Sequence, residues 1–366
     1  MAGNSFGNIF RITTWGESHG KALGVVVDGV PAGLELCEED IQLFLDRRKP
    51  GQTGISTPRK EDDLVEILSG VFEGKTTGTS LSMMVKNTSQ KSRDYSQIAD
   101  CYRPGHADYT FDEKYGFRDY RGGGRSSGRE TIGRVAGGAI ASKILKEMGI
   151  DVFAYTTAIG PVKIDRENFD RNAILLNPTA MPDNVANEQA LAFLQTARAN
   201  YDSVGGVMEC TVTGLPAGLG DPVFEKLDAN LARAIMSIGA VKAVEIGDGV
   251  RVSESLGSEN NDAFFADETG IHKATNHSGG TLGGISDGAP LVLRAYVKPT
   301  PSIFQTQHTV NRDGENTEIA IKGRHDPIIV PRAVVVMESM TALTVLDALL
   351  LNMTARLDRI VEFYGS

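Results

Sequence analysis

The chain has 366 residues, 41% of them hydrophobic and 23% charged, with a formal net charge of −10. This composition suits a globular protein with a sizeable core, and the acidic balance argues against nucleic acid or an anionic membrane as the main partner. Cys37, Cys101 and Cys210 form no CxxC pair, so we expect no disulfide framework, no metal site and a reducing compartment. The N-terminus has no basic segment followed by an apolar run, which predicts a cytoplasmic protein without a signal peptide.

The elements expected in chain order form two similar series. Each series contains a β-rich run, a helical pattern, a VEI tripeptide and a long apolar helix. The first series lies at 24–27, 38–46, 65–67 and 130–148, and the second at 207–212, 228–238, 244–246 and 332–351. The octapeptides VDGVPAGL and VTGLPAGL start at Val27 and Val212, 185 residues apart.

Chance explains any one of these matches, but their common order favours an internal duplication. We therefore expect a single domain with two pseudosymmetric halves, about 1–150 and 205–366, and one site between them. Residues 160–200 are expected to form a polar insertion. The apolar stretch from Val330 to Leu351 is interrupted by Arg332, Glu338 and Asp347, which predicts a buried helix and not a membrane span.

The first motif with chemical content is GESHG at 16–20. It matches the GxSxG pattern of a nucleophile elbow, but an elbow needs a helix directly after it. Here Val25, Val26 and Val27 predict another strand, so Ser18 is not expected to act as a nucleophile. His19 lies in a glycine-flanked turn, where it either contacts a ligand or only stabilises the turn.

The second feature is an arginine belt, which holds seven of the 22 arginines between residues 93 and 134: Arg93, Arg103, Arg118, Arg121, Arg125, Arg129 and Arg134. A solvated surface is one interpretation. However, arginine suits two-point binding of phosphate and carboxylate, and Gly122, Gly123 and Gly124 allow backbone amides to approach an anion. Ser126 and Ser127 precede a helix expected near Glu130. Together these residues predict an anion site, although no GK[ST] completes a P-loop.

Three further motifs lie in the second half. KPTPS at 298–302 offers lysine, threonine and serine as phosphate donors on a backbone restrained by proline. KGRHDP at 322–327 contains Asp326, either a helix cap or a general base. The glycine-rich NHSGGTLGG at 276–284 allows a flat ring to lie against the backbone. No two histidines have metal-site spacing beside a helical glutamate, so no metal is expected.

In this order, GESHG, RPGHAD (103–108), RGGGRSSGRET (121–131), NHSGGTLGGIS, KPTPS and GRHDP resemble the chorismate synthase family over essentially the whole chain. The resemblance implies a lyase that converts 5-enolpyruvylshikimate 3-phosphate to chorismate and phosphate, the last shared step towards the aromatic amino acids. It also implies reduced FMN without net redox change. The implied fold is α+β, a helical core sandwiched between two antiparallel sheets, assembled as a homotetramer.

The resemblance also assigns roles residue by residue. His19 would protonate the departing phosphate, His106 would stabilise or protonate the reduced flavin anion, and Asp326 would help the flavin N5 accept a proton. Substrate phosphate and carboxylates would be held by Arg48, Arg103, Arg129, Arg134 and Arg324. FMN would contact Arg125, Ser126, Ser127, Gly239, Ala240, Gly283, Lys298, Pro299, Thr300, Pro301, Ser302 and Arg324.

Two positions depart from the family pattern. Gly239 stands where many members have asparagine, and Gly54 where an arginine is common. The hydrogen bond to the flavin ring and the contact to a flavin phosphate or nicotinamide are therefore unassigned at these positions. No GxGxxG follows a strand, which favours an external flavin reductase, with NADPH only as an indirect reductant. The rival interpretations are an inactive anion-binding protein of the same fold and a hydrolase.

Overall fold

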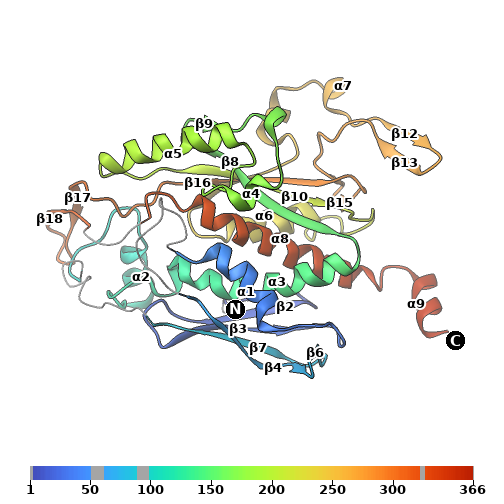
Figure 1. Ribbon diagram of the computed structural model, residues 1–366, viewed down its shortest axis with the longest axis horizontal. Helices are drawn as coiled ribbons and strands as arrows, with labels where there is room; N and C mark the ends of the chain where they lie inside the picture. Colours follow the sequence, from blue (N-terminus) through green and yellow to red (C-terminus); the bar gives the residue numbers. More distant parts are fainter. Residues whose placement is uncertain (1–2, 51–61, 89–98, 322–325, 366) are drawn as a thin grey trace.

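The computed structural model describes residues 3–50, 62–88, 99–321 and 326–365. In these residues two five-stranded sheets enclose a layer of helices (Figure 1). All neighbouring strands in both sheets are antiparallel. The first sheet has the order β1 (Ser5–Phe6), β2 (Arg11–Gly16), β3 (Ala22–Asp28), β7 (Leu81–Lys86), β4 (Val65–Ser69). The second has the order β11 (Val241–Ile246), β16 (Leu291–Val297), β10 (Gly206–Thr213), β8 (Asp151–Ile159), β9 (Val162–Lys163).

The helical layer contains four of the described helices, α1 (Glu38–Arg48), α3 (Thr131–Glu147), α6 (Leu227–Met236) and α8 (Val330–Asn352). Glycines allow α3 to approach its neighbours closely. A Cβ at Gly138 would lie 2.2 Å from the Cβ of Ser339 on α8, and one at Gly133 would lie 2.9 Å from the Thr14 side chain on β2. Helical glycine costs about 1 kcal/mol relative to alanine, and the close packing on both faces offsets that cost. The predicted sandwich is confirmed.

The helix α8 is the central element of the core. Its length and composition would allow it to cross a membrane, but 78% of its most apolar window is buried inside the protein. Its buried charges have partners, as burial of a charge requires. Glu338 forms a two-point ion pair with Arg47, and Asp347 accepts backbone hydrogen bonds from residues 8–10. The expectation of a buried helix is confirmed.

The two sheets repeat one order of strands. In the first sheet β2, β3, β7 and β4 are neighbours in that order, and in the second β8, β10, β16 and β11 are. A helix of the middle layer follows β3 and β10 in the chain, and another follows β7 and β16. The internal duplication stays a prediction, and this common order supports it.

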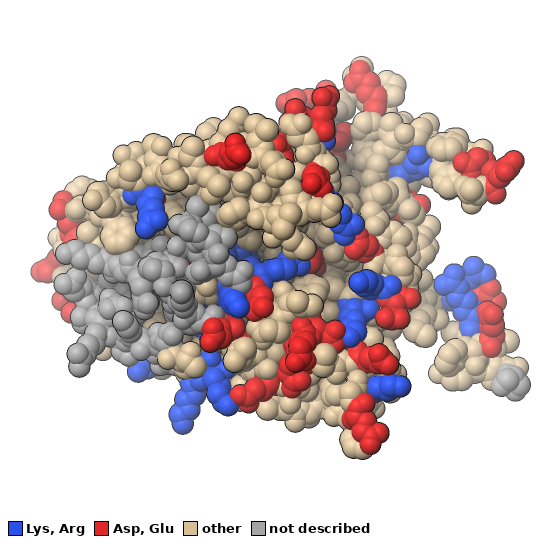
Figure 2. Space-filling view, in the orientation of Figure 1, with Lys and Arg blue, Asp and Glu red and all other residues tan. Residues whose placement is uncertain are grey.

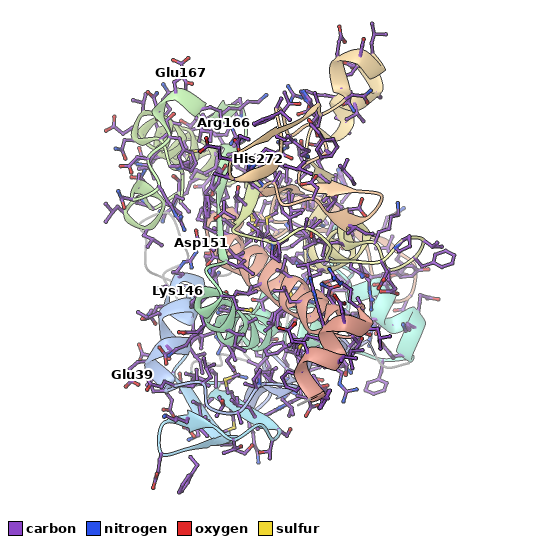
Figure 3. All side chains as sticks on the ribbon, turned by 90° about the vertical axis from the view of Figure 1, so that its right-hand side faces the viewer. Glu39, Lys146, Asp151, Arg166, Glu167 and His272 are labelled. Carbon is purple, nitrogen blue, oxygen red and sulfur yellow. The ribbon has the colours of Figure 1, made fainter. Side chains whose placement is uncertain are left out.

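Residues 160–200 lie mainly outside the second sheet, where α5 (Asn184–Ala199) covers its outer face (Figure 1). Figure 3 shows the layers in sequence, from Glu39 on the side of the first sheet, through Lys146 and Asp151, to Arg166 and Glu167 beyond the second sheet. The C-terminal helix α9 (Leu357–Tyr364) buries no residue and projects from the body (Figure 1).

The remaining described elements are short. They are β5 (Val71–Phe72), β6 (Lys75–Thr76), α2 (Asp108–Tyr115), α4 (Ala173–Leu176), α7 (Gly257–Asn260), β12 (Phe264–Asp267), β13 (Gly270–Lys273), β14 (Thr281–Leu282), β15 (Ile285–Ser286), β17 (Gln307–Val310) and β18 (Asn316–Ile319). Among them, α2 begins at the last residue of RPGHAD, and β14 and β15 lie within NHSGGTLGGIS.

Candidate functional site

The turn that carries His19 joins β2 to β3. In this turn the backbone amide of Gly20 donates to the Glu17 carbonyl at 3.0 Å, and this hydrogen bond closes a four-residue β-turn. The His19 Nδ1 lies 3.2 Å from the Ser18 hydroxyl. A Cβ at Gly122 would lie 2.2 Å from this Nδ1, so glycine there allows the imidazole to pack on the arginine belt's backbone. The strand β3 follows the turn directly, which agrees with rejecting a nucleophile elbow.

Behind this turn two arginines share one carboxylate. The Asp63 side chain, fully buried, lies 2.8 Å from the Arg48 guanidinium and 3.0 Å from that of Arg129. Arg48 also donates to the Gly128 carbonyl at 3.1 Å. Burial lowers the pKa of Arg48 to about 10, against the opposing effect of Asp63, so the guanidinium stays charged at neutral pH. Within the described part of the chain, two guanidinium groups therefore lie beside a single carboxylate.

The same cluster continues to Asp326. The Arg332 guanidinium donates to the backbone carbonyl of Arg48 at 2.9 Å and forms an ion pair with Asp326. Arg332 also lines a cavity of about 120 Å³ together with Arg47 and Lys49. The helix α8 begins at Val330 with Ile329 as its N-cap. Asp326 is therefore not the cap of α8, and the cap interpretation is wrong.

His106 belongs to a second group of contacts. Its Nδ1 lies 3.2 Å from the Pro104 carbonyl, and its Nε2 lies 2.8 Å from the Ser302 hydroxyl. A carbonyl oxygen only accepts, so the Nδ1 carries a proton, and in the neutral form of the ring the Nε2 accepts from the Ser302 hydroxyl. Lys298 donates to the Gly105 carbonyl at 2.8 Å. RPGHAD and KPTPS, nearly 200 residues apart, thus form one unit.

Further contacts bring the two groups together. The Ser203 hydroxyl donates to the Thr300 carbonyl at 2.6 Å, and the amide of the next residue, Val204, donates to the Pro327 carbonyl at 2.8 Å. The segment that carries Asp326 and the KPTPS segment therefore both flank residues 203–204. On the face of the molecule drawn in Figure 2, basic side chains lie near the middle, at the level of the helical layer.

One predicted substrate ligand, Arg134, and several predicted cofactor contacts lie near residues 237–240. Arg134 on α3 donates to the Ser237 hydroxyl at 2.6 Å, and the backbone amide of Lys298 donates to the Ala240 carbonyl at 2.9 Å. Ala240 has a left-handed φ of +72°, which is uncommon for a residue with a Cβ. An added Cβ at Gly239, next to Ala240, would have no atom of the described residues within 4 Å. The backbone at 239–240 therefore lies beside Lys298, another residue predicted to contact FMN.

The other predicted FMN contacts differ in how they are engaged. Arg125 donates to the Gly16 carbonyl at 3.1 Å and to the Thr14 hydroxyl at 2.7 Å, so it anchors the end of β2. The Ser126 hydroxyl donates to the Gly123 carbonyl, and the Ser127 hydroxyl accepts from the Arg129 amide. A Cβ at Gly283, which has a φ of +61°, would meet no described atom within 4 Å. The buried Thr300 hydroxyl has no hydrogen-bond partner among the described residues.

The arginine belt is not uniform. Arg103 forms two 2.7 Å contacts with Asp108, which holds the pKa of that carboxyl below its usual value despite burial. Arg118 pairs with Asp112. Arg121, half exposed, pairs with Asp119. Only part of the belt therefore adds to the positive charge near His19. Arg93, Gly54, Arg324 and His325 lie outside the described residues.

Sequence reasoning missed a second buried ion network, next to the NHSGGTLGG loop. Lys273 lies 3.1 Å from Asp262 and 2.7 Å from Asp287, and all three side chains are at least 95% buried. Asp262 also accepts the backbone amides of His277 and Ser278, at 2.8 and 3.0 Å. This network fixes the start of the glycine-rich loop. No rule of residue spacing predicts this network from the sequence. The same is true of the contacts made by Asp63, Asn87 and Arg332.

Comparisons with known proteins agree over the full length. The family model described as chorismate synthase matches residues 10–350. A chorismate synthase of Agathobacter rectalis is 68% identical over 364 residues, covering 100% of this chain and 99% of its own. That of Methanococcoides burtonii is 55% identical over 350 residues, covering 95% and 96%. A solved structure titled "Crystal Structure of Chorismate Synthase" superposes with a TM-score of 0.75 at 31% identity, covering 98% of this chain and 97% of the solved one.

Proposed function

The chain belongs to the chorismate synthase family, and we propose that it converts 5-enolpyruvylshikimate 3-phosphate to chorismate and phosphate. The reaction is an anti-1,4-elimination: phosphate leaves carbon 3, a hydrogen leaves carbon 6, and a new double bond forms. The enzyme is thus a carbon–oxygen lyase acting on a phosphate, and the reaction needs reduced FMN without net redox change. The observation that carries this proposal is the pair of buried arginines that share Asp63 behind the His19 turn.

The charge of the ligands explains why such a pair is useful. The substrate carries two carboxylates and a phosphate, and FMN adds another phosphate. Anions of this charge bind together in one pocket only where fixed cations outnumber fixed anions. The proposed substrate ligands are Arg48, Arg103, Arg129, Arg134 and Arg324. Arg48 and Arg129 have the strongest support because they share one carboxylate, whereas Asp108 competes for Arg103.

His19 is proposed to donate a proton to the departing phosphate. Its turn lies next to Arg129, the two being connected through Asn87. A positioned imidazole can act as a general acid, which contributes about 10²- to 10⁴-fold to a rate. The arginines would meanwhile balance the negative charge that develops on the leaving group.

The described residues fit FMN at the junction of the two halves. In the part of the chain that the structure describes, the buried Thr300 hydroxyl has no hydrogen-bond partner, and no atom lies within 4 Å of a Cβ added at Gly239 or Gly283. Reduced FMN supplies an electron-rich ring that promotes loss of phosphate and accepts the hydrogen from carbon 6. We propose that His106, held by Pro104 and Ser302, orients its imidazole towards the flavin, and that Asp326 would help the flavin N5 accept a proton.

An anaerobic phosphate-release assay tests the proposal. With the enolpyruvyl substrate and dithionite-reduced FMN, we expect phosphate and chorismate in equal amounts. Oxidised FMN should give neither product. Phosphate release without flavin would indicate a hydrolase. Binding of substrate and FMN without any product would indicate an inactive anion-binding protein of the same fold.

The reductant is proposed to come from outside. We expect NADPH alone to give no product in air-free solution, and NADPH with an added flavin reductase to restore turnover. A rate with NADPH alone equal to that with dithionite would contradict this expectation. Cys37, Cys101 and Cys210 are all free thiols, which is compatible with the proposed cytoplasmic location.

We also propose a homotetramer. Large apolar side chains are exposed on two projecting elements, α9 and the β12–β13 hairpin. They include Leu357 at 76%, Phe363 at 70%, Phe264 at 61% and Ile271 at 76% exposure. Apolar groups of this size on projecting elements are typical of subunit contacts. Native mass spectrometry should give about four times the 39.2 kDa chain mass, and a monomer would refute the proposal.

A further inference from the structure

Asn87 spans both ends of the turn that carries His19. It follows β7, and its side-chain amide nitrogen donates to the Glu17 carbonyl at 3.0 Å and to the Gly20 carbonyl at 2.8 Å. These two carbonyls belong to the first and last residues of the β-turn. The backbone amide of Asn87 donates to the Lys21 carbonyl at 3.1 Å. Three contacts from one residue therefore fix the turn against the end of β7.

The orientation of this amide is determined by Arg129. The Arg129 Nε donates to the Asn87 Oδ1 at 2.9 Å. A guanidinium has only donors, so the oxygen of the amide must face Arg129 and the nitrogen must face the two carbonyls. Both hydrogens of the Asn87 amide nitrogen are then used on the turn. The residue fits this position in one orientation only.

We propose that Asn87 is a positioning residue that couples the orientation of His19 to Arg129 and, through Asp63, to Arg48. The inference rests on the proposed function, in which His19 is the acid and the arginines bind the substrate's anionic groups. An anion that binds Arg129 acts on the same guanidinium that orients Asn87. One amide side chain thus couples substrate binding at Arg129 to the alignment of the proton donor His19. Asn87 itself touches no reacting atom.

The substitution Asn87→Asp separates the two contacts. Aspartate keeps an acceptor for Arg129 but places a carboxylate oxygen against the Glu17 and Gly20 carbonyls, where like partial charges repel. We expect kcat to fall about 10²-fold while the KM for substrate changes less than threefold. Asn87→Ser, which retains one hydroxyl donor, should lose less kcat than Asn87→Asp. If Asn87 served only to hold Arg129, Asn87→Asp would keep kcat within threefold of the unmodified enzyme, and that result would overturn the proposal.

An NMR measurement on His19 requires no turnover, so it tests the role of Asn87 independently of the proposed function. The chain has six histidines, so ¹³C-labelled histidine gives few signals, and the His19 signal is assigned with His19→Ala. We expect Asn87→Asp and Asn87→Ser to move the His19 signal and its titration, and to leave that of His308 unchanged. Asn230→Ala, which removes an exposed amide on α6, is the matched control. An unmoved His19 signal in both variants refutes the inference, whereas absence of chorismate from the unmodified enzyme refutes only the proposed function.

Discussion

The two buried ion networks of this protein have opposite compositions. Near the His19 turn, Arg48 and Arg129 flank the single carboxylate of Asp63. Near the glycine-rich loop, the single ammonium of Lys273 lies between Asp262 and Asp287. Among the residues that the structure describes, the first network has two cations beside one carboxylate, and the second has two carboxylates beside one cation. Each imbalance needs a different remedy, because a buried charge without compensation is costly.

The remedies differ in where they come from. In the second network, backbone amides, the Thr275 hydroxyl and Lys273 all donate to Asp262, so the chain compensates its own charge. In the first network, we propose that the anionic substrate supplies the missing charge. A network completed by the protein fixes a loop, whereas one left with excess charge can bind a ligand. The following predictions test that distinction, from the largest effect to the smallest.

Removing either of the proposed catalytic histidines should have the largest effect on turnover. We expect His19→Ala and His106→Ala each to lower kcat by about 10²- to 10⁴-fold, the usual worth of a general acid or base. Steady-state kinetics of chorismate formation under anaerobic conditions measures the effect. His308→Ala, at a 90% exposed side chain, is the control. Values within threefold of the unmodified enzyme for both variants would remove these histidines from the mechanism.

Lys273→Met should affect stability and not chemistry directly. It leaves two buried carboxylates without their shared cation, for which we expect a loss of about 3–5 kcal/mol in the free energy of unfolding. Lys86→Met breaks an exposed pair with Glu66 and should cost less than about 1 kcal/mol. Urea unfolding compares the two variants. Equal losses would mean that the Lys273 network does not contribute to folding as its burial implies.

Arg129→Ala should weaken substrate binding by about 1.5–3 kcal/mol, the worth of a lost charged hydrogen bond. Arg121→Ala changes another arginine of the same belt, but one that is half exposed and paired with Asp119, and it should leave affinity unchanged. Calorimetric titration with the substrate gives both values. If the two variants bind equally well, the excess charge around Asp63 is structural and the comparison between the networks fails.

Acid should weaken the carboxylate-rich network. Burial alone would raise the pKa of Asp262, but the hydrogen bonds from Thr275, Ser278, His277 and Lys273 outweigh it and hold that pKa well below the usual range. The stability this carboxyl contributes is therefore complete above about pH 4, its unfolded pKa, and is lost as pH falls below it. Asp262→Asn should be less stable at pH 7 but lose less between pH 5 and pH 3. Urea midpoints across this range provide the measurement, and parallel curves would exclude this role.

Much of the scaffold follows from sequence alone. Apolar spacing predicted α1, α3, α6 and α8 within a few residues of their bounds, and the charges in Val330–Leu351 predicted a buried helix. Glycine-flanked motifs also marked His19 and His106 as candidates. These features are local, since helix periodicity and turn chemistry depend on residues a few positions apart.

The charge pairing was decided only by tertiary structure. Asp63 lies 15 residues from Arg48 in the chain, and Ser302 lies 196 residues from His106. Which carboxylate meets which arginine depends on how α1, α3 and α8 pack between the sheets, and no local pattern encodes that. For the same reason, sequence could not tell that Arg332 is the partner of Asp326 or that Asn87 holds the His19 turn. A residue's type limits its possible partners, and the packing of distant elements selects one of them.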